Sequence, residues 1–361
     1  MAQEQGLGTV LVTGGAGFIG TTLARLVGDR ADRWVVLDNL HPQVHADQTW
    51  PADLPDHVET VLGDVTDPAA WDALLAGVRP DVVVHLAAET GTAQSLDEST
   101  RHGMVNVVGT TTMLDAFGRA GHRPQHVVLT SSRAVYGEGT WATEDGRIFR
   151  PTTRTHAQLD AGQWDHALDG APGHHLPNRA DDTLPSPTSV YGATKLAQEH
   201  LLAAWTSSYD VTLSVLRLQN VYGPRQSLTN PYTGIVSLFS QLARNGKSIP
   251  LYEDGEITRD FVYIDDVATA LAAALGRELD GTPLLADVGT GTRTTIRQLA
   301  EAVAEFHGAP EPHVTGQYRD GDVRHAACSL EATAAVLDWQ PAWTLTAGVA
   351  ALQEWIAGEL D

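Results

Sequence analysis

Residues 9–20 read Thr9-Val10-Leu11-Val12-Thr13-Gly14-Gly15-Ala16-Gly17-Phe18-Ile19-Gly20, an apolar run followed at once by closely spaced glycines. The β-branched run predicts a buried strand, and the residues after the glycines can begin a helix. Glycines at this spacing permit a tight turn, close approach of the backbone to a pyrophosphate, and close packing of the helix on the strand. The stretch therefore predicts the phosphate-binding turn of a dinucleotide-binding α/β fold.

Further short apolar runs recur along the chain, separated by segments long enough to hold a helix. They are residues 34–37, 82–86, 127–130 and 213–218. Nearly continuous apolar strands that alternate with helical segments are typical of parallel strands with helical crossovers. The sequence thus predicts an α/β fold with a doubly wound (Rossmann) parallel sheet. After about Asn220 the apolar runs shorten and Pro and Gly become more frequent, which predicts a smaller C-terminal α/β domain.

An acidic residue, Asp38, ends the second predicted strand. A carboxylate at this place can accept hydrogen bonds from the adenosine ribose hydroxyls and would repel a 2′-phosphate, so it favours NAD over NADP. Asp64 and Val65 follow Leu62 and Gly63, where the end of a strand could meet the adenine. Ala87 and Ala88 follow the run 82–86, where small side chains allow the cofactor to approach closely.

Tyr191 and Lys195 form a Tyr-Gly-Ala-Thr-Lys sequence, with the two side chains one helical turn apart. A free tyrosine has a pKa of about 10, and a neighbouring ammonium favours its phenolate, so the pair could move a proton near neutral pH. Ser132 ends the predicted strand 127–130 and could hydrogen-bond the reacting oxygen. Tyr191, Lys195 and Ser132 are the predicted catalytic residues.

Composition limits the possible partners. The chain has 361 residues, with 45 acidic and 23 basic side chains and a formal charge of −22. Nucleic acid and anionic membranes bind basic surfaces, so neither is expected as a partner. The single cysteine, Cys328, excludes an internal disulfide and a cysteine-based zinc site. No secretory leader and no long apolar span are evident, and a cytoplasmic location is expected.

The order of motifs resembles the nucleotide-sugar epimerase/dehydratase family of extended short-chain dehydrogenases/reductases. Besides the residues above, the resemblance is carried by His85-Leu86-Ala87-Ala88, Asn106-Val107-Val108-Gly109-Thr110, Leu216-Arg217-Leu218-Gln219-Asn220-Val221-Tyr222-Gly223-Pro224, Arg259-Asp260-Phe261-Val262-Tyr263 and Arg319-Asp320-Gly321-Asp322.

The resemblance implies two domains and a complete set of site residues. Residues 1–220, together with about 261–289, form the NAD-binding domain, and residues 221–260 and 290–361 form the domain that binds a nucleotide sugar. The implied cofactor site comprises Gly14, Gly17, Phe18, Ile19, Gly20, Asp38, Asn39, Asp64, Val65, Leu86, Ala87, Ala88, Asn106, Tyr191 and Lys195. The implied substrate site comprises Ser132, Arg133, Asn220, Arg259 and Arg319, with the diphosphate held by the last three. Two guanidiniums can contact phosphates in this way even in an acidic protein.

Within the family, the residues after Ser132 separate the reactions. Dehydratases and some decarboxylases place an additional acid or base there, whereas this chain has Arg133 and Ala134. The resemblance therefore implies 4-epimerisation of a dTDP- or UDP-hexose through a 4-keto intermediate, as in UDP-galactose 4-epimerase. Residues 131–139 and 219–234 resemble the dTDP-L-rhamnose 4-epimerase group more closely. A 4,6-dehydratase, a UDP-glucuronate-type decarboxylase, a 4-ketoreductase and a catalytically silent dinucleotide-binding sensor remain alternatives. A homodimer is implied by resemblance alone.

Residues 138–183 depart from the alternating pattern, being rich in Gly, Pro, His, Asp and Thr. A segment of that length is too long for an ordinary loop, so it is expected to be an inserted flap. It has no cysteine, and its histidines (His156, His166, His174 and His175) lack the spacing of metal ligands. No metal site is therefore expected.

Overall fold

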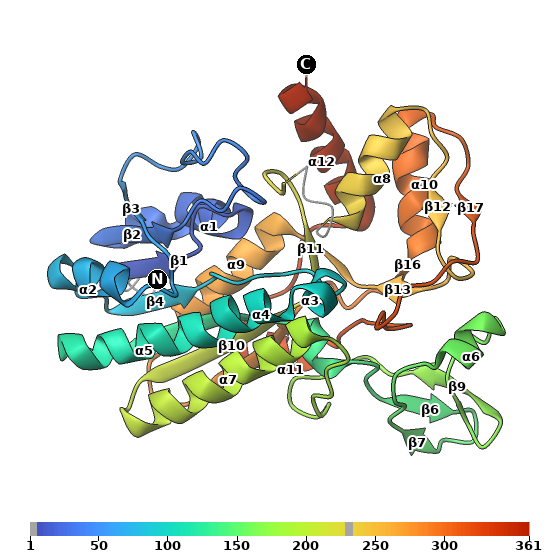
Figure 1. The fold of residues 1–361 in the computed structure, drawn as a ribbon, viewed down its shortest axis with the longest axis horizontal. Helices are drawn as coiled ribbons and strands as arrows, with labels where there is room; N and C mark the ends of the chain where they lie inside the picture. The colour runs from blue at the N-terminus through green and yellow to red at the C-terminus, as the bar shows by residue number, and fades with distance from the viewer. Residues whose placement is uncertain (1–5, 228–233, 361) are drawn as a thin grey trace.

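A seven-stranded parallel sheet is the centre of the fold (Figure 1), in the computed structural model, which describes residues 6–227 and 234–360. The strand order is β15-β10-β5-β4-β1-β2-β3. The order reverses between β1 and β4, and ligands of open α/β sheets bind at the carboxyl ends of strands at such a point. The strands are β1 (Thr9–Thr13), β2 (Arg33–Asp38), β3 (Val58–Leu62), β4 (Val82–His85), β5 (His126–Ser132), β10 (Thr212–Leu218) and β15 (Leu284–Val288).

The five strands expected from the apolar runs are confirmed, and the α/β fold class with them. Two strands were not anticipated from the sequence. Strand β3 lies at the sheet edge and reads Val-Glu-Thr-Val-Leu, so its polar residues interrupt the apolar pattern. Strand β15 pairs with β10 although about 70 residues separate them in the chain, a long-range pairing that local pattern does not encode.

Helices cover both faces of the sheet, so each strand is buried on both sides. Val10 and Val12 face one hydrophobic core, and Leu11 between them faces the other. The first core lies under α1 (Phe18–Val27), α9 (Ile264–Leu275) and α11 (Glu331–Leu337); the second lies under α2 (Pro68–Gly77), α5 (Gly109–Ala120) and α7 (Val190–Ser208). The apolar runs are nearly continuous because almost every side chain of the inner strands is buried, whereas the edge strand β3 is largely exposed.

The C-terminal part adds a third core, separate from the other two. Its helices stand together on one side of the molecule (Figure 1) and are α8 (Ile235–Arg244), α10 (Ile296–His307) and α12 (Leu345–Leu360). Its short strands are β11 (Asn220–Tyr222), β12 (Pro250–Leu251), β13 (Thr258–Arg259), β14 (Phe261–Tyr263), β16 (Thr294–Thr295) and β17 (His313–Val314).

The division into two domains stays a prediction, and one element departs from its boundaries. Helix α11 belongs to the range 290–361 assigned to the second domain, yet Leu337 packs in the core of the large sheet beside α9. The chain therefore returns to the large sheet after it has formed most of the C-terminal part. The remaining short helical segments are η1 (Gly28–Arg30), α3 (Gln94–Asp97), α4 (Ser99–His102), the π-helical η2 (Gly103–Val108) and η3 (Arg133–Tyr136).

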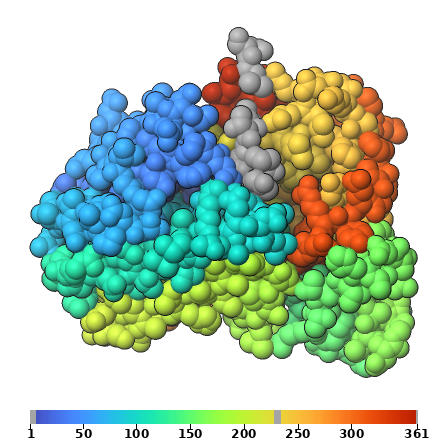
Figure 2. Space-filling view, in the orientation of Figure 1, coloured from blue at the N-terminus to red at the C-terminus, as the bar shows by residue number. Residues whose placement is uncertain are grey.

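Residues 138–183 fold into a small unit that protrudes from the large sheet (Figure 1). It contains a four-stranded antiparallel sheet in the order β7-β6-β9-β8 and a short helix. Its elements are β6 (Trp141–Thr143), β7 (Ile148–Phe149), α6 (His156–Asp160), β8 (Ala167–Leu168) and β9 (Ala171–His175). Figure 2 shows this green unit packed against the orange segment that precedes α11.

Buried charges join this insertion to the C-terminal part. Arg154 pairs with Glu253 at 2.9 Å, and Arg324 pairs with the same carboxylate at 2.9 Å. Arg154 also donates to the backbone oxygen of Asp322 at 2.9 Å. The backbone nitrogen of Arg324 donates to Glu138 at 3.1 Å. The insertion is thus anchored at the segment that carries Asp322, which bears on the candidate site below.

The helices that the structure describes include none long and apolar enough to span a membrane.

Candidate active site

The glycine-rich turn has the geometry that its sequence predicts. Gly14 has φ +67°, and a Cβ there would lie 2.7 Å from the backbone of Ala87. A Cβ on Gly20 would lie 2.5 Å from Gly15, so the helix packs directly on the turn. Gly17 caps α1 without a side-chain hydrogen bond, and the first turn carries no acidic residue. The amides at this helix start are therefore open to an anion, and the turn fits a pyrophosphate.

Asp38 lies at the end of β2, beside this turn, and is almost fully buried. Its Oδ2 accepts the Ala16 amide at 3.0 Å and its Oδ1 accepts the Leu40 amide at 2.8 Å. The carboxylate thus holds the turn in place, and each oxygen keeps a lone pair for a ribose hydroxyl. Asn39 donates to Asp64 at 2.8 Å, which joins the ends of β2 and β3 at the expected adenosine side.

The remaining predicted cofactor residues divide into two groups. Phe18, Ile19, Leu86, Ala87 and Ala88 are partly exposed around the strand ends, where a ligand can reach them. Val65 is buried, and Asn106 is fully buried within the π-helical turn η2.

The amide of Asn106 is used entirely within the protein. Its Oδ1 accepts the Glu89 amide at 2.7 Å, and its Nδ2 donates to the Glu89 carbonyl at 3.0 Å and to Thr194 at 2.9 Å. We assign it a positioning role, because it ties the loop after β4 to helix α7.

Helix α7 begins where the Ser189 hydroxyl accepts the Gly192 amide, and it carries Tyr191 and Lys195. Tyr191 lies close enough to Ser132, at the end of β5, for the serine hydroxyl to affect the pKa of its phenol. Burial raises the pKa of the Tyr191 phenol, and both the Ser132 hydroxyl and the Arg133 charge oppose that rise. Burial also lowers the pKa of Lys195 to about 7. The structure therefore brings the three predicted catalytic residues together.

Two arginines lie close to the catalytic hydroxyls. Nε of Arg133 donates to Asn220 at 2.7 Å, and Nη2 of Arg259 pairs with Asp322 at 2.6 Å. Burial and the nearby Arg259 charge lower the pKa of Arg133 to about 9. Two neighbouring cations repel one another, and a bound anion such as a diphosphate would stabilise both.

Arg319 does not join this group. Its side chain is exposed, and its guanidinium lies 4.8 Å from the centre of the Tyr252 ring. The prediction that it contacts the diphosphate remains untested, whereas Asp322, three residues later, reaches Arg259 directly. Asp322 belongs to the same motif as Arg319, but its pairing with Arg259 joins distant segments and could not be predicted from the local sequence.

Among the described residues no three or more His, Cys, Asp or Glu side chains are arranged to hold a metal ion. The insertion histidines instead differ in exposure. His166 and His175 are buried against the fully buried Trp141, with ring centres 4.8 and 5.9 Å away. His156 and His174 are exposed.

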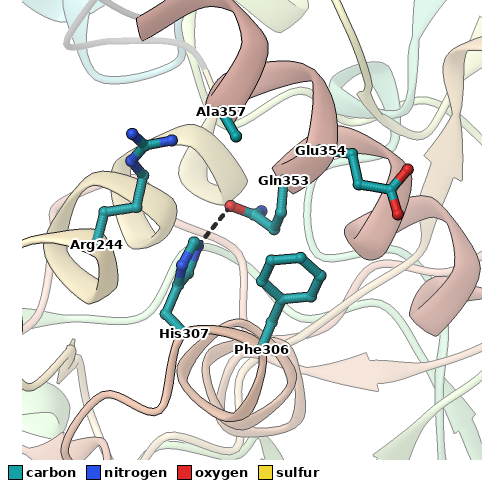
Figure 3. A pocket seen from close by; sticks show the side chains of 6 residues that line it. All are labelled: Arg244, Phe306, His307, Gln353, Glu354 and Ala357. Carbon is teal, nitrogen blue, oxygen red and sulfur yellow. Dashed lines mark hydrogen bonds between the residues drawn. The ribbon is translucent and has the colours of Figure 1, made fainter. Parts of the chain in front are cut away.

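A cavity of about 410 Å³ lies elsewhere, between α8, α10 and α12 (Figure 3). Arg244 and His307 lie in the last turns of their helices, where positive charge offsets the negative helix end. His307 also pairs with Gln353 at 2.9 Å. These contacts account for the polar residues of the cavity, and we assign it no role.

Comparison with known proteins agrees with the geometry. The sequence matches the NAD dependent epimerase/dehydratase family over residues 10–157 and 168–284. A dTDP-L-rhamnose 4-epimerase of Burkholderia thailandensis is 58% identical over 353 residues, which cover 98% of this chain and 96% of the relative.

Solved structures of UDP-glucose 4-epimerases share the fold. The Thermotoga maritima enzyme with UDP-glucose has a TM-score of 0.78 and 27% identity. The Thermus thermophilus enzyme in complex with NAD has a TM-score of 0.74 and 28% identity. In both comparisons 98% of this chain and all of the other chain are covered. The turn, the Ser132–Tyr191–Lys195 group and these matches lead to one conclusion: the chain belongs to the NAD dependent epimerase/dehydratase family.

Proposed function

We propose that this protein is a nucleotide-sugar 4-epimerase whose preferred substrate is dTDP-L-rhamnose. It is an NAD-dependent enzyme of the isomerase class. The observation that carries the proposal is the placement of Ser132, at the end of β5, next to Tyr191 on α7. Ser132 is followed by Arg133 and Ala134 instead of the additional acid that elimination requires. The 58% identity to a dTDP-L-rhamnose 4-epimerase supports the choice of sugar.

Each residue of the site has a separate role in the proposed reaction. NAD, when bound, supplies reversible oxidation of carbon 4. Tyr191 takes the proton of the 4-hydroxyl, with Ser132 hydrogen-bonded to the same oxygen, and later returns a proton to it. Ser132 and the Arg133 charge oppose the effect of burial on Tyr191, and Lys195, one helical turn along α7, is proposed to add its charge in favour of the phenolate. No net oxidation results, so the enzyme needs no second substrate.

Epimerisation also requires the 4-keto sugar to turn while the nucleotide stays bound. Arg133, Asn220 and Arg259 form the proposed grip on the diphosphate. The apolar and small residues at the strand ends, Ala87 and Ala88, leave the sugar with fewer fixed contacts. If the diphosphate stays bound while the sugar rotates, the keto intermediate is not released.

The test is incubation of the purified protein, without added cofactor, with dTDP-L-rhamnose and a panel of UDP- and dTDP-hexoses. NMR of the sugar protons should show interconversion of a 4-epimer pair, fastest with dTDP-L-rhamnose. Stoichiometric appearance of a 4-keto-6-deoxy sugar would identify a dehydratase, and a pentose would identify a decarboxylase. Oxidation of added NADH with each turnover would identify a ketoreductase. Bound NAD with no conversion of any sugar would favour the sensor.

A homodimer is part of the proposal. Met104 and Val108 are exposed apolar side chains one turn apart on the helix that runs beside α7, and Leu96 is exposed nearby. A second copy that covers this face would remove them from water. Light scattering should give twice the monomer mass of 38.6 kDa. The Met104→Glu/Val108→Glu variant should give the monomer mass, and an unchanged dimer would place the interface elsewhere. The cytoplasmic location also remains a prediction, which cell fractionation would test.

A further inference from the structure

A network of buried polar side chains lies beside Lys195. Its members, Glu199, Ser131, Arg217, Tyr136 and Asp287, have no role in the mechanism above. Glu199 follows Lys195 by four residues on α7, so the two side chains share one face of the helix. Lys195 is 3% exposed and Glu199 is 7% exposed. The Glu199 carboxylate accepts the Ser131 hydroxyl at 2.5 Å. It also accepts two hydrogen bonds from Arg217, Nε to Oε1 at 3.0 Å and Nη2 to Oε2 at 2.7 Å.

This network of polar side chains continues to β15, at the edge of the sheet. The Arg217 guanidinium lies 4.8 Å from the centre of the Tyr136 ring, and the Tyr136 hydroxyl donates to Asp287 at 2.9 Å. The cation of Arg217 therefore lies between two buried carboxylates, and one of them, Glu199, is one helical turn from Lys195 on α7. Bidentate geometry on both oxygens fixes the Glu199 carboxylate, because neither oxygen can turn without losing a bond.

His85 on β4 is the other titratable group that faces Lys195, and it is neutral. The Thr110 hydroxyl donates to the Asn106 carbonyl at 2.6 Å, so its oxygen accepts from Nε2 of His85 at 3.0 Å. Nδ1 of His85 is then the acceptor for Thr13 at 2.7 Å. Burial, together with the Lys195 charge, lowers the pKa of His85 to about 3.

Of the described residues, Glu199 is the charged group that acts on the pKa of Lys195, and the neighbouring phenol, hydroxyls and guanidinium are neutral or cationic. Tyr191 on the same helix is a phenol whose pKa is raised by burial. Ser131 and Ser132 on β5 are hydroxyls, and Arg217 on β10 is a cation. Glu199 is therefore the anion that can offset burial of the ammonium.

We propose that Glu199 is a positioning residue of the active site, whose carboxylate, held by Arg217 and Ser131, keeps the Lys195 ammonium charged. Its consequence for catalysis rests on the proposed function, because a charged Lys195 is what favours the Tyr191 phenolate. The effect on Lys195 itself does not depend on which reaction the protein catalyses. Burial lowers the pKa of Lys195 to about 7 and the Glu199 charge opposes that fall, in agreement with the geometry.

The chain offers an unusually direct measurement, because it has two lysines, Lys195 and Lys247. Protein labelled with ¹³C at the lysine Cε should give two side-chain signals by NMR. Lys247 is exposed after α8 and provides an internal reference. The titration is carried out on the protein with its bound NAD, before and after each substitution, with denaturation curves recorded for every variant.

Glu199→Gln should lower the titration midpoint of Lys195 by about one pH unit or more, since it removes the adjacent anion. Glu199→Asp, which keeps the charge, should restore most of the difference. Asp287→Asn is the matched control: it makes the same acid-to-amide change in the same buried network, and should move the midpoint by less than about 0.3 unit, because Asp287 adjoins Arg217 and Tyr136 rather than Lys195.

If Glu199→Gln leaves Arg217 too poorly compensated to fold, Glu199→Gln/Arg217→Met removes both charges. The Lys195 midpoint should still fall, by less than in the single variant. An unchanged midpoint in whichever of these variants folds would overturn the proposal and leave Glu199–Arg217 as a structural brace between α7 and the sheet. A lowered midpoint in a protein that epimerises no sugar would sustain this inference while the proposed function failed. In an active enzyme, the alkaline limb of the kcat profile should move down by the same amount.

Discussion

Tyr191 and Lys195 lie where burial disfavours the charged form of each, so their hydrogen-bond and charge partners decide whether they can act near neutral pH. Ser132 and Arg133 help the Tyr191 phenolate, and Glu199 helps the Lys195 ammonium. Each of these partners comes from the last residue of β5, from the residue that follows it, or from the next turn of α7. The chemistry of single residues here is thus set by neighbours that are themselves buried.

Substitution Tyr191→Phe should abolish the proposed epimerisation, with kcat falling by about 10³-fold or more, because the proton acceptor is lost. The protein should still retain NAD, since the ring stays in place without its hydroxyl. Sugar-proton NMR for turnover and the absorbance of cofactor released on denaturation measure the two quantities. Undiminished turnover would exclude Tyr191 as the acid and base.

Asp287 should make stability depend on pH. Burial raises its pKa to about 7, so the folded protein holds a proton that the unfolded chain, with an aspartate pKa of about 3.9, releases. Stability from this group is therefore present at low pH and is lost as pH rises from about 4 to 7. Asp287→Asn should gain about 1–2 kcal/mol relative to the parent between pH 5 and pH 8. Urea denaturation at both values checks this, with the exposed Asp169→Asn as control; parallel curves would contradict it.

At the scale of elements, the insertion 138–183 acts through the segment that it anchors. Arg154 contacts both Glu253 and the backbone of Asp322, and Asp322 pairs with Arg259 of the proposed diphosphate grip. The insertion sheet thus lies outside the parallel sheet but is connected to the substrate side of the site by two successive contacts.

Arg154→Met should lower the free energy of unfolding by about 3–5 kcal/mol, because it leaves a buried carboxylate without one of its cations. It should also raise KM for the nucleotide sugar more than it lowers kcat, since Arg259 loses its support. The control is Arg147→Met in the same insertion, whose side chain is 44% exposed and pairs with Asp145 and Asp169. It should change stability by no more than about 0.5 kcal/mol. Equal effects of the two substitutions would argue against the anchor.

Across the whole molecule, the loop of residues 39–57 joins the two sides of the strand-end region. It begins at Asn39 beside the proposed ribose site, and Asp53 within it pairs with Arg225, which follows β11. Ser227 also donates to the backbone oxygen of Gln43 at 3.4 Å. Because the loop begins at the expected ribose site, we predict that this connection slows release of the cofactor.

Asp53 also pairs with Arg25, so Asp53→Asn weakens two partly exposed ion pairs and should speed NAD dissociation by about two- to five-fold. Release of the bound cofactor after dilution provides the measurement. Asp72→Asn, which breaks an exposed pair with Arg119 between α2 and α5, should leave the rate unchanged. A rate unaffected by Asp53→Asn would mean that the loop does not retain the cofactor.

The sequence by itself determined the α/β class, five strands of the large sheet and the glycine-rich turn, and it predicted the group Ser132, Tyr191 and Lys195 as catalytic. These depend on local patterns: alternation of apolar runs, glycines that exclude a Cβ, and two side chains one helical turn apart. Residues 228–233, which belong to the segment 219–234 that carries part of the resemblance, lie outside the described part of the chain.

The tertiary structure alone decided the contacts between distant segments. It paired β15 with β10, folded the insertion as an antiparallel sheet, and placed Asp322 rather than Arg319 against Arg259. It also buried Arg324 together with Glu253, a pairing of residues 71 positions apart. Such contacts arise because buried charges require partners, and the fold supplies those partners from segments that no local sequence pattern connects.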